Sequence, residues 1–100
     1  MGLFLRYAQP AELTDQGWEE DSILVGNGYL GANIFGGISD ERIQITENSM
    51  FKHNINNPRS RERGLTNFAE LCLQFPHMSA TEYERGLCLD NALAYTQYRL

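Results

Sequence analysis

The chain has 100 residues, of which 42% are hydrophobic and 21% are charged, as in an ordinary globular protein. This length accommodates one small domain or part of a larger one. The formal net charge of −5 disfavours partners such as nucleic acid or an anionic membrane, because both would repel an acidic surface. No apolar run reaches membrane-spanning length and no secretory signal peptide is seen, so we expect a cytoplasmic protein without nucleic-acid or membrane partners.

A first strand is predicted at residues 3–8 and ends at Pro10, because proline cannot donate a hydrogen bond to a strand ladder. Residues 11–21 are polar apart from Leu13 and Trp18, and we expect a loop there with at most one helical turn. Trp18 carries a large apolar ring, which favours a partly buried anchor over a binding platform.

A glycine-rich stretch at residues 23–37 contains five of the nine glycines, and its turn motif comprises Gly26, Asn27, Gly28, Gly31, Gly36 and Gly37. The first three of these glycines match the dinucleotide pattern G-x-G-x-x-G. That pattern binds pyrophosphate where a helix begins directly after it. Here a helix would be broken at Gly36-Gly37, whereas residues 30–34 alternate with the period of a strand. We therefore predict a tight turn at residues 26–28 that leads into a strand.

The next predicted strand is the most regular in the chain. After a hairpin loop at residues 38–41, residues 42–46 alternate strictly between polar and apolar, and Ile43 and Ile45 are expected to face the core. Residues 47–51 follow without a clear period.

A long surface loop is predicted at residues 52–64, which are predominantly polar. Three more strands are predicted at residues 68–75, 83–89 and 92–100. The whole chain is thus predicted to be all-β. Because the last strand runs to Leu100, we expect residues 1–100 to be a single domain or a subdomain cut from a longer chain.

Two cysteines permit one geometric inference. If residues 68–75 pair antiparallel with residues 83–89, Cys72 lies opposite Cys88 and the geometry permits a disulfide. Reduced thiols are favoured, because nothing in the sequence indicates secretion. The cysteines form no C-x-x-C motif and His53 and His77 lie far apart, so we assign no metal and expect no cofactor.

Catalytic motifs are absent from the sequence: it contains neither G-x-S-x-G nor H-E-x-x-H. Runs of acidic residues in polar segments are interpreted as solvated loops. Glu47 and Asn48 lie at a strand end beside Phe51, and this group of polar and apolar side chains is the best candidate for contact with a substrate.

Four segments, which follow one another in the same order as in a known family, are more specific than any single pattern: residues 22–37, 41–49, 64–71 and 83–92. The last segment reads Tyr-Glu-Arg-Gly-Leu-Cys-Leu-Asp-Asn-Ala. Together they resemble the N-terminal domain of bacterial α-L-fucosidases of glycoside hydrolase family 95, whose own segment reads Tyr-x-Arg-x-Leu-x-Leu-Asp-x-Ala. The resemblance extends from about Tyr7 to Leu100.

The resemblance implies a β-rich N-terminal domain, an antiparallel two-sheet β-sandwich that precedes a helical barrel. Residues 1–100 would then be a single β-sandwich domain or subdomain at the N-terminal end of a longer, multidomain enzyme. In such enzymes a glutamic acid and an activated water, both on the barrel, hydrolyse the fucosyl bond with inversion. None of the barrel residues maps onto this chain, so no catalytic residue is assigned and the chain alone is not expected to be catalytic. The implied partners are the barrel of the same polypeptide and, through it, an oligosaccharide substrate. Many relatives have tryptophan where this chain has Phe51, and many carry a helical insert in place of residues 52–64.

Two other functions remain open. A stand-alone carbohydrate-binding module would need an aromatic platform, for which the candidates are Tyr7, Trp18, Tyr29, Phe51, Tyr95 and Tyr98. A structural or oligomerisation domain would instead associate through unpaired sheet edges.

Overall fold

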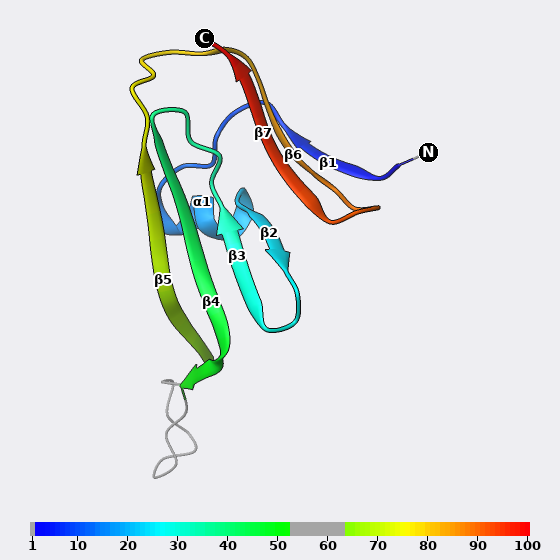
Figure 1. Ribbon diagram of the computed structural model, residues 1–100, viewed down its shortest axis with the longest axis vertical. Coiled ribbons are helices and arrows are strands. Elements are labelled where there is room, and N and C mark those ends of the chain that lie inside the picture. The colour runs from blue at the N-terminus through cyan, green and yellow to red at the C-terminus, as the bar shows by residue number, and fades with distance from the viewer. Residues whose placement is uncertain (1, 53–63) are drawn as a thin grey trace.

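A computed structural model describes the backbone of residues 2–52 and 64–100, and the side chains of residues 2–49 and 69–100. The described residues form seven strands and one short helix (Figure 1): β1 Phe4–Tyr7, α1 Asp15–Glu20, β2 Ile23–Gly26, β3 Leu30–Ile34, β4 Asp40–Lys52, β5 Gly64–Gln74, β6 Thr81–Cys88 and β7 Leu93–Arg99. All strand pairs are antiparallel, in two sheets of order β1-β6-β7 and β2-β3-β4-β5. The predicted all-β, antiparallel fold class is confirmed.

The polar segment after β1 contains the helix α1, which has six residues. It forms because the Thr14 hydroxyl caps it and accepts a hydrogen bond from the Gly17 amide at 3.0 Å. Trp18, predicted to be a partly buried anchor, is 38% exposed and is one of the exposed large apolar side chains.

The glycine-rich stretch forms the β2–β3 hairpin, as predicted. Gly28 has a φ of +90°, and the Asn27 side-chain oxygen accepts hydrogen bonds from the amides of Tyr29 and Leu30 at 2.9 and 2.8 Å. This is the role that Gly and Asn take in tight turns. A strand follows the turn where a dinucleotide site would need a helix, so the G-x-G-x-x-G match is a hairpin.

β4 continues through residues 47–51 to Lys52, although these residues show no clear period in the sequence. The pairing of β4 with β5 shifts register between Ile45 and Thr46 and again between Thr46 and Phe51. Such irregularities interrupt the period of two, which is why the pattern in the sequence stops at residue 46. Of the predicted surface loop, residues 53–63 lie outside the described residues, whereas Lys52 and Gly64 pair with one another in the sheet.

The pairing of residues 68–75 with residues 83–89, on which the possible disulfide depended, does not occur. Cys72 lies opposite Arg42 of β4, and Cys88 lies opposite Phe4 of β1 and Leu93 of β7. The two cysteines are therefore in different sheets, and both are free thiols. The error arises because β5 and β6 are consecutive strands but do not form a hairpin: the chain crosses from one sheet to the other between them.

The two sheets are joined by two side chains on one face of β6. Arg85, only 1% exposed, donates from Nε to the Gln9 carbonyl at 2.8 Å and from Nη1 to the Asp21 carbonyl at 2.6 Å. The Tyr83 hydroxyl donates to the Gly36 carbonyl. Burial raises the pKa of Tyr83 to about 12, so this hydroxyl remains a donor at neutral pH. We call Arg85 and Tyr83 the inter-sheet clamp.

The apolar faces of the sheets are largely uncovered. Among the described apolar side chains, only Ala11, Ile23 and Phe35 are fully buried. By register, one face of the four-stranded sheet carries Val25, Leu30, Ala32, Ile34, Ile43, Ile45, Ala69, Leu71 and Leu73. Ile43 and Ile45 lie on this face, as predicted, but are only half-buried. Figure 1 shows the two sheets side by side.

Gly36 is required by the clamp. Its φ is +75°, and a Cβ there would lie 2.6 Å from both Arg85 Cδ and the Tyr83 hydroxyl oxygen. We expect Gly36→Ala to lower the free energy of unfolding by about 3 kcal/mol, the sum of a left-handed backbone cost and an overpacking cost. Gly28→Ala is the matched control, because Gly28 also has positive φ but nothing within 4 Å of its Cβ position. We expect it to cost only about 1 kcal/mol in urea unfolding; equal losses would contradict the clamp.

Candidate functional site

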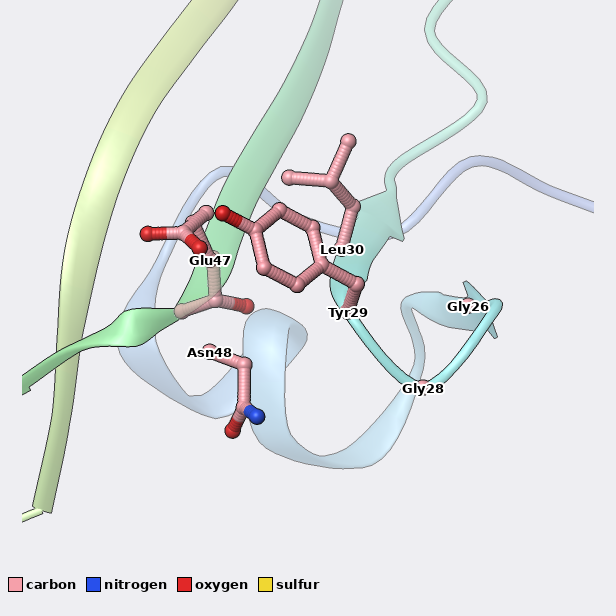
Figure 2. Close-up of a pocket in the computed structure, with 8 residues that line it drawn as sticks. Gly26, Gly28, Tyr29, Leu30, Glu47 and Asn48 are labelled. Atoms are coloured by element: carbon pink, nitrogen blue, oxygen red, sulfur yellow. The ribbon is translucent and has the colours of Figure 1, made fainter.

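An open pocket of about 230 Å³ lies between the β2–β3 turn and the middle of β4 (Figure 2). The turn supplies most of its wall, and β4 supplies its polar residues. The lining comprises Gly26, Gly28, Tyr29, Leu30, Gly31, Thr46, Glu47 and Asn48.

Strand pairing brings these residues together. Leu30 lies opposite Glu47 and Gly31 opposite Thr46 in the β3–β4 ladder. The Asn48 amide donates to the Tyr29 carbonyl at 2.8 Å, which extends the ladder into the turn. The tip of the hairpin is therefore held against β4 by backbone hydrogen bonds on both sides.

Glu47 is the centre of the pocket's hydrogen bonding, and its side chain is only 8% exposed. Its carboxylate accepts hydrogen bonds from the Ser49 hydroxyl and from the Ser49 amide, the latter at 3.0 Å. The Tyr29 hydroxyl also bonds it, and Figure 2 shows that hydroxyl directed at the carboxylate. These bonds, with that from the Ser49 hydroxyl strongest, hold the pKa of Glu47 below its ordinary 4.5, so the group is an anion at neutral pH.

The pKa of Tyr29 is shifted in the opposite direction to that of Glu47. Its hydrogen bond to Glu47, and then the charge of that carboxylate, raise the pKa of Tyr29 above its ordinary 10.0. The side chain is nevertheless 58% exposed, so the aromatic ring is available to a ligand. The pocket thus combines a fixed carboxylate with an accessible aromatic ring.

The predicted site residues are only partly brought together. Glu47 and Asn48 both line the pocket, but their side chains point to opposite sides of β4 in Figure 2, as strand neighbours do. The side chain of Phe51 lies outside the described residues. Gly36 and Gly37 lie at the other end of β3, away from this pocket.

Sequence reasoning missed two groups. Tyr29 was a candidate only for an aromatic platform. Its contact with Glu47 depends on the register between β3 and β4, which the sequence does not specify. Arg85 was given no role, although an arginine between Tyr83 and Leu87 on the inward side of a predicted strand is a signal of a buried, hydrogen-bonded group.

The aromatic candidates do not share one face among the described residues. Tyr7 lies under the Arg85 guanidinium, and the Arg85 Cζ is 4.2 Å from the centroid of the Tyr7 ring. Tyr95 lies on the opposite face of the same sheet, where its hydroxyl donates to Glu84 at 2.9 Å. Tyr98 stacks against Tyr83 at a centroid distance of 6.2 Å. This arrangement offers no common platform.

Within the described ranges, no three His, Cys, Asp or Glu side chains gather as a metal site would need. The same ranges contain no helix long and apolar enough to cross a membrane. Among the described lining residues, Glu47 is the only acidic one, so they do not supply the carboxylate pair that glycoside hydrolysis uses. The Glu47 carboxylate and the exposed Tyr29 ring are suited to binding a ligand.

The pairing of Glu47 with Tyr29 can be tested by titration. Glu47→Gln removes the charge that opposes ionisation of Tyr29, so we expect the pKa of Tyr29 to fall toward 10.0, measured by absorbance at alkaline pH. Because the folded pKa of Glu47 is lowered, its stabilisation is present above pH 4.5 and is lost as the pH falls through the folded pKa. The variant should therefore lose less stability on acidification. An unchanged Tyr29 titration would contradict the contact.

Comparison with known families adds what geometry alone does not give. Residues 5–63, which include β2 to β4 and all of β1 except Phe4, match the family described as the glycosyl hydrolase family 65 N-terminal domain. A search of curated proteins finds no match. The match supports the coarser part of the resemblance noted above, a glycoside hydrolase N-terminal β-domain. Since it covers more than half of the sequence, the chain belongs to the glycosyl hydrolase family 65 N-terminal domain family.

Proposed function

We propose that this chain is the N-terminal β-portion of a bacterial, inverting α-L-fucosidase-like glycoside hydrolase of family 95. In this proposal it supports a helical-barrel catalytic domain of the same cytoplasmic polypeptide. The family match over residues 5–63 is the observation that carries the proposal. The finer assignment to fucosidases rests on the four segments that resemble family 95.

The uncovered apolar surface supports a domain contact. Leu30, Leu71 and Leu73 are 43%, 45% and 37% exposed on one face of the four-stranded sheet. β5 is an edge strand of this sheet and has 11 residues, so it also presents unpaired backbone groups. Apolar surface of this kind is typical of a region that another domain covers.

Catalysis is assigned to the barrel. Inversion requires a general acid and a general base about 6.5–9.5 Å apart, with a water between them. No other described residue of the pocket lining places a carboxylate beside Glu47, and Tyr29 and Ser49 hold Glu47 as an anion, which a general acid must not be. In this proposal the chain forms one edge of the substrate cleft and no part of the acid–base pair.

The same exposed surface also suits a second function, that of an oligomerisation domain. A second copy that pairs with β5 would cover the strand edge and the apolar face together. A stable dimer without glycosidase activity would favour this alternative over the hydrolase.

The proposal predicts the stereochemistry of a reaction. We expect the protein expressed from the complete open reading frame that encodes this chain to hydrolyse an α-L-fucoside. Because inversion reverses the anomeric configuration, ¹H NMR of the early reaction should detect β-L-fucose first. Residues 1–100 expressed alone should release no fucose, and a matched β-D-galactoside should not be cleaved. Early α-L-fucose would contradict inversion, and a reading frame that ends at Leu100 would overturn the hydrolase proposal.

A further inference from the structure

The pocket at the tip of the β2–β3 hairpin has the dimensions of a small, single-ring ligand. Its volume of about 230 Å³ is below the roughly 300–1,000 Å³ typical of sites for drug-sized molecules. Gly26, Gly28 and Gly31 line it, so no side chain projects from those three positions into the space. A flat ring that lies along the hairpin turn would reach both Tyr29 and Glu47.

The hydrogen-bonding capacity that remains in the pocket favours a ligand rich in hydroxyl groups. A carboxylate offers about four acceptor positions, and Ser49 and Tyr29 occupy three of those of Glu47. With respect to the described residues, one acceptor position is left, together with the lone pairs of the Tyr29 hydroxyl. Both would accept from a ligand O–H, and the exposed Tyr29 ring would cover an apolar C–H face of the same ligand. Pyranose rings present both kinds of surface.

The negative charge of the pocket disfavours anionic ligands. Glu47 is an anion held by hydrogen bonds, the described lining has no basic side chain, and the chain carries a net charge of −5. An anionic sugar such as a uronate would therefore be repelled at close range. A neutral pyranoside would not.

The site is pre-organised. The Asn27 side chain fixes the turn by accepting from two amides, and the Asn48 amide fixes the Tyr29 backbone. The Tyr29 ring is further oriented by its hydroxyl bond to Glu47. A ligand would thus meet groups already in position, which lowers the entropic cost of binding.

We propose that Tyr29 and Glu47, in the pocket formed by the β2–β3 turn and β4, form a subsite that binds one neutral pyranose ring. The inference rests on the proposed function and deepens it, because it specifies where this chain would contact the oligosaccharide. The Tyr29 ring stacks on the sugar, and Glu47 accepts one of its hydroxyl groups.

The test uses the ¹⁵N-labelled chain and three probes: methyl α-L-fucopyranoside, and the matched pair methyl β-D-glucopyranoside and methyl β-D-glucuronoside. We expect at least one neutral probe to shift the amide resonances of residues 26–31 and 46–49 with a millimolar Kd, and the glucuronoside to bind more weakly than the glucoside. Tyr29→Ala should weaken binding at least about tenfold, and Glu47→Gln by about fivefold, the effects of losing a stacked ring and a charged acceptor.

Tyr95→Phe is the matched control, because Tyr95 also bonds a carboxylate, that of Glu84, but lies outside the pocket. It should bind like the parent chain, whereas Tyr29→Phe should bind more weakly through loss of the hydroxyl alone. The proposal is overturned if neither neutral probe shifts these resonances in the folded chain, or if Tyr29→Ala binds like the parent chain. Either result leaves the fucose-release experiment untouched, so the two proposals fail separately.

Discussion

A buried guanidinium determines how the two sheets of this chain are arranged. Transfer of the Arg85 charge from water into the protein costs several kcal/mol, and no described carboxylate forms an ion pair with it. Two hydrogen bonds from the charged group to carbonyls, each worth about 1.5–3 kcal/mol, and the Tyr7 ring at about 2 kcal/mol offset that cost. Because the carbonyls of Gln9 and Asp21 flank α1, the guanidinium fixes β6 relative to the start of the four-stranded sheet.

The inter-sheet clamp leaves the apolar face of the four-stranded sheet uncovered, and this exposed surface bears on the function of the chain. The sheets are held near Gly36, while Leu30 and Leu71 on the apolar face remain exposed. A chain that functioned as an independent enzyme would be expected to bury such a face, whereas a part of a larger hydrolase would cover it with another domain. The β2–β3 turn of the same sheet carries Tyr29 and β4 carries Glu47, so one sheet offers both an exposed apolar face and a pocket that contains a carboxylate.

Local patterns in the sequence predicted most of the strands, because each depends only on neighbouring residues. The alternation at Ile43 and Ile45 and the turn at Gly28 are examples, and both are present in the structure. Pairing between distant segments was not predictable in this way. Cys72 was placed opposite Cys88 because consecutive strands usually form hairpins, and the crossover between the sheets breaks that rule. The Tyr29–Glu47 contact was missed for the same reason, since it depends on inter-strand register.

Nuclear Overhauser effects between the Tyr83 ring and the Gly36 α-protons, compared between the parent chain and Arg85→Met, test the central claim most directly. Methionine fills much of the volume of arginine but cannot donate to the Gln9 and Asp21 carbonyls. The account predicts that these cross-sheet effects disappear in the variant, while effects within the sheet, such as those between Leu30 and Glu47, are retained. Cross-sheet effects of undiminished intensity would show that the sheets are held together without Arg85 and would contradict the account.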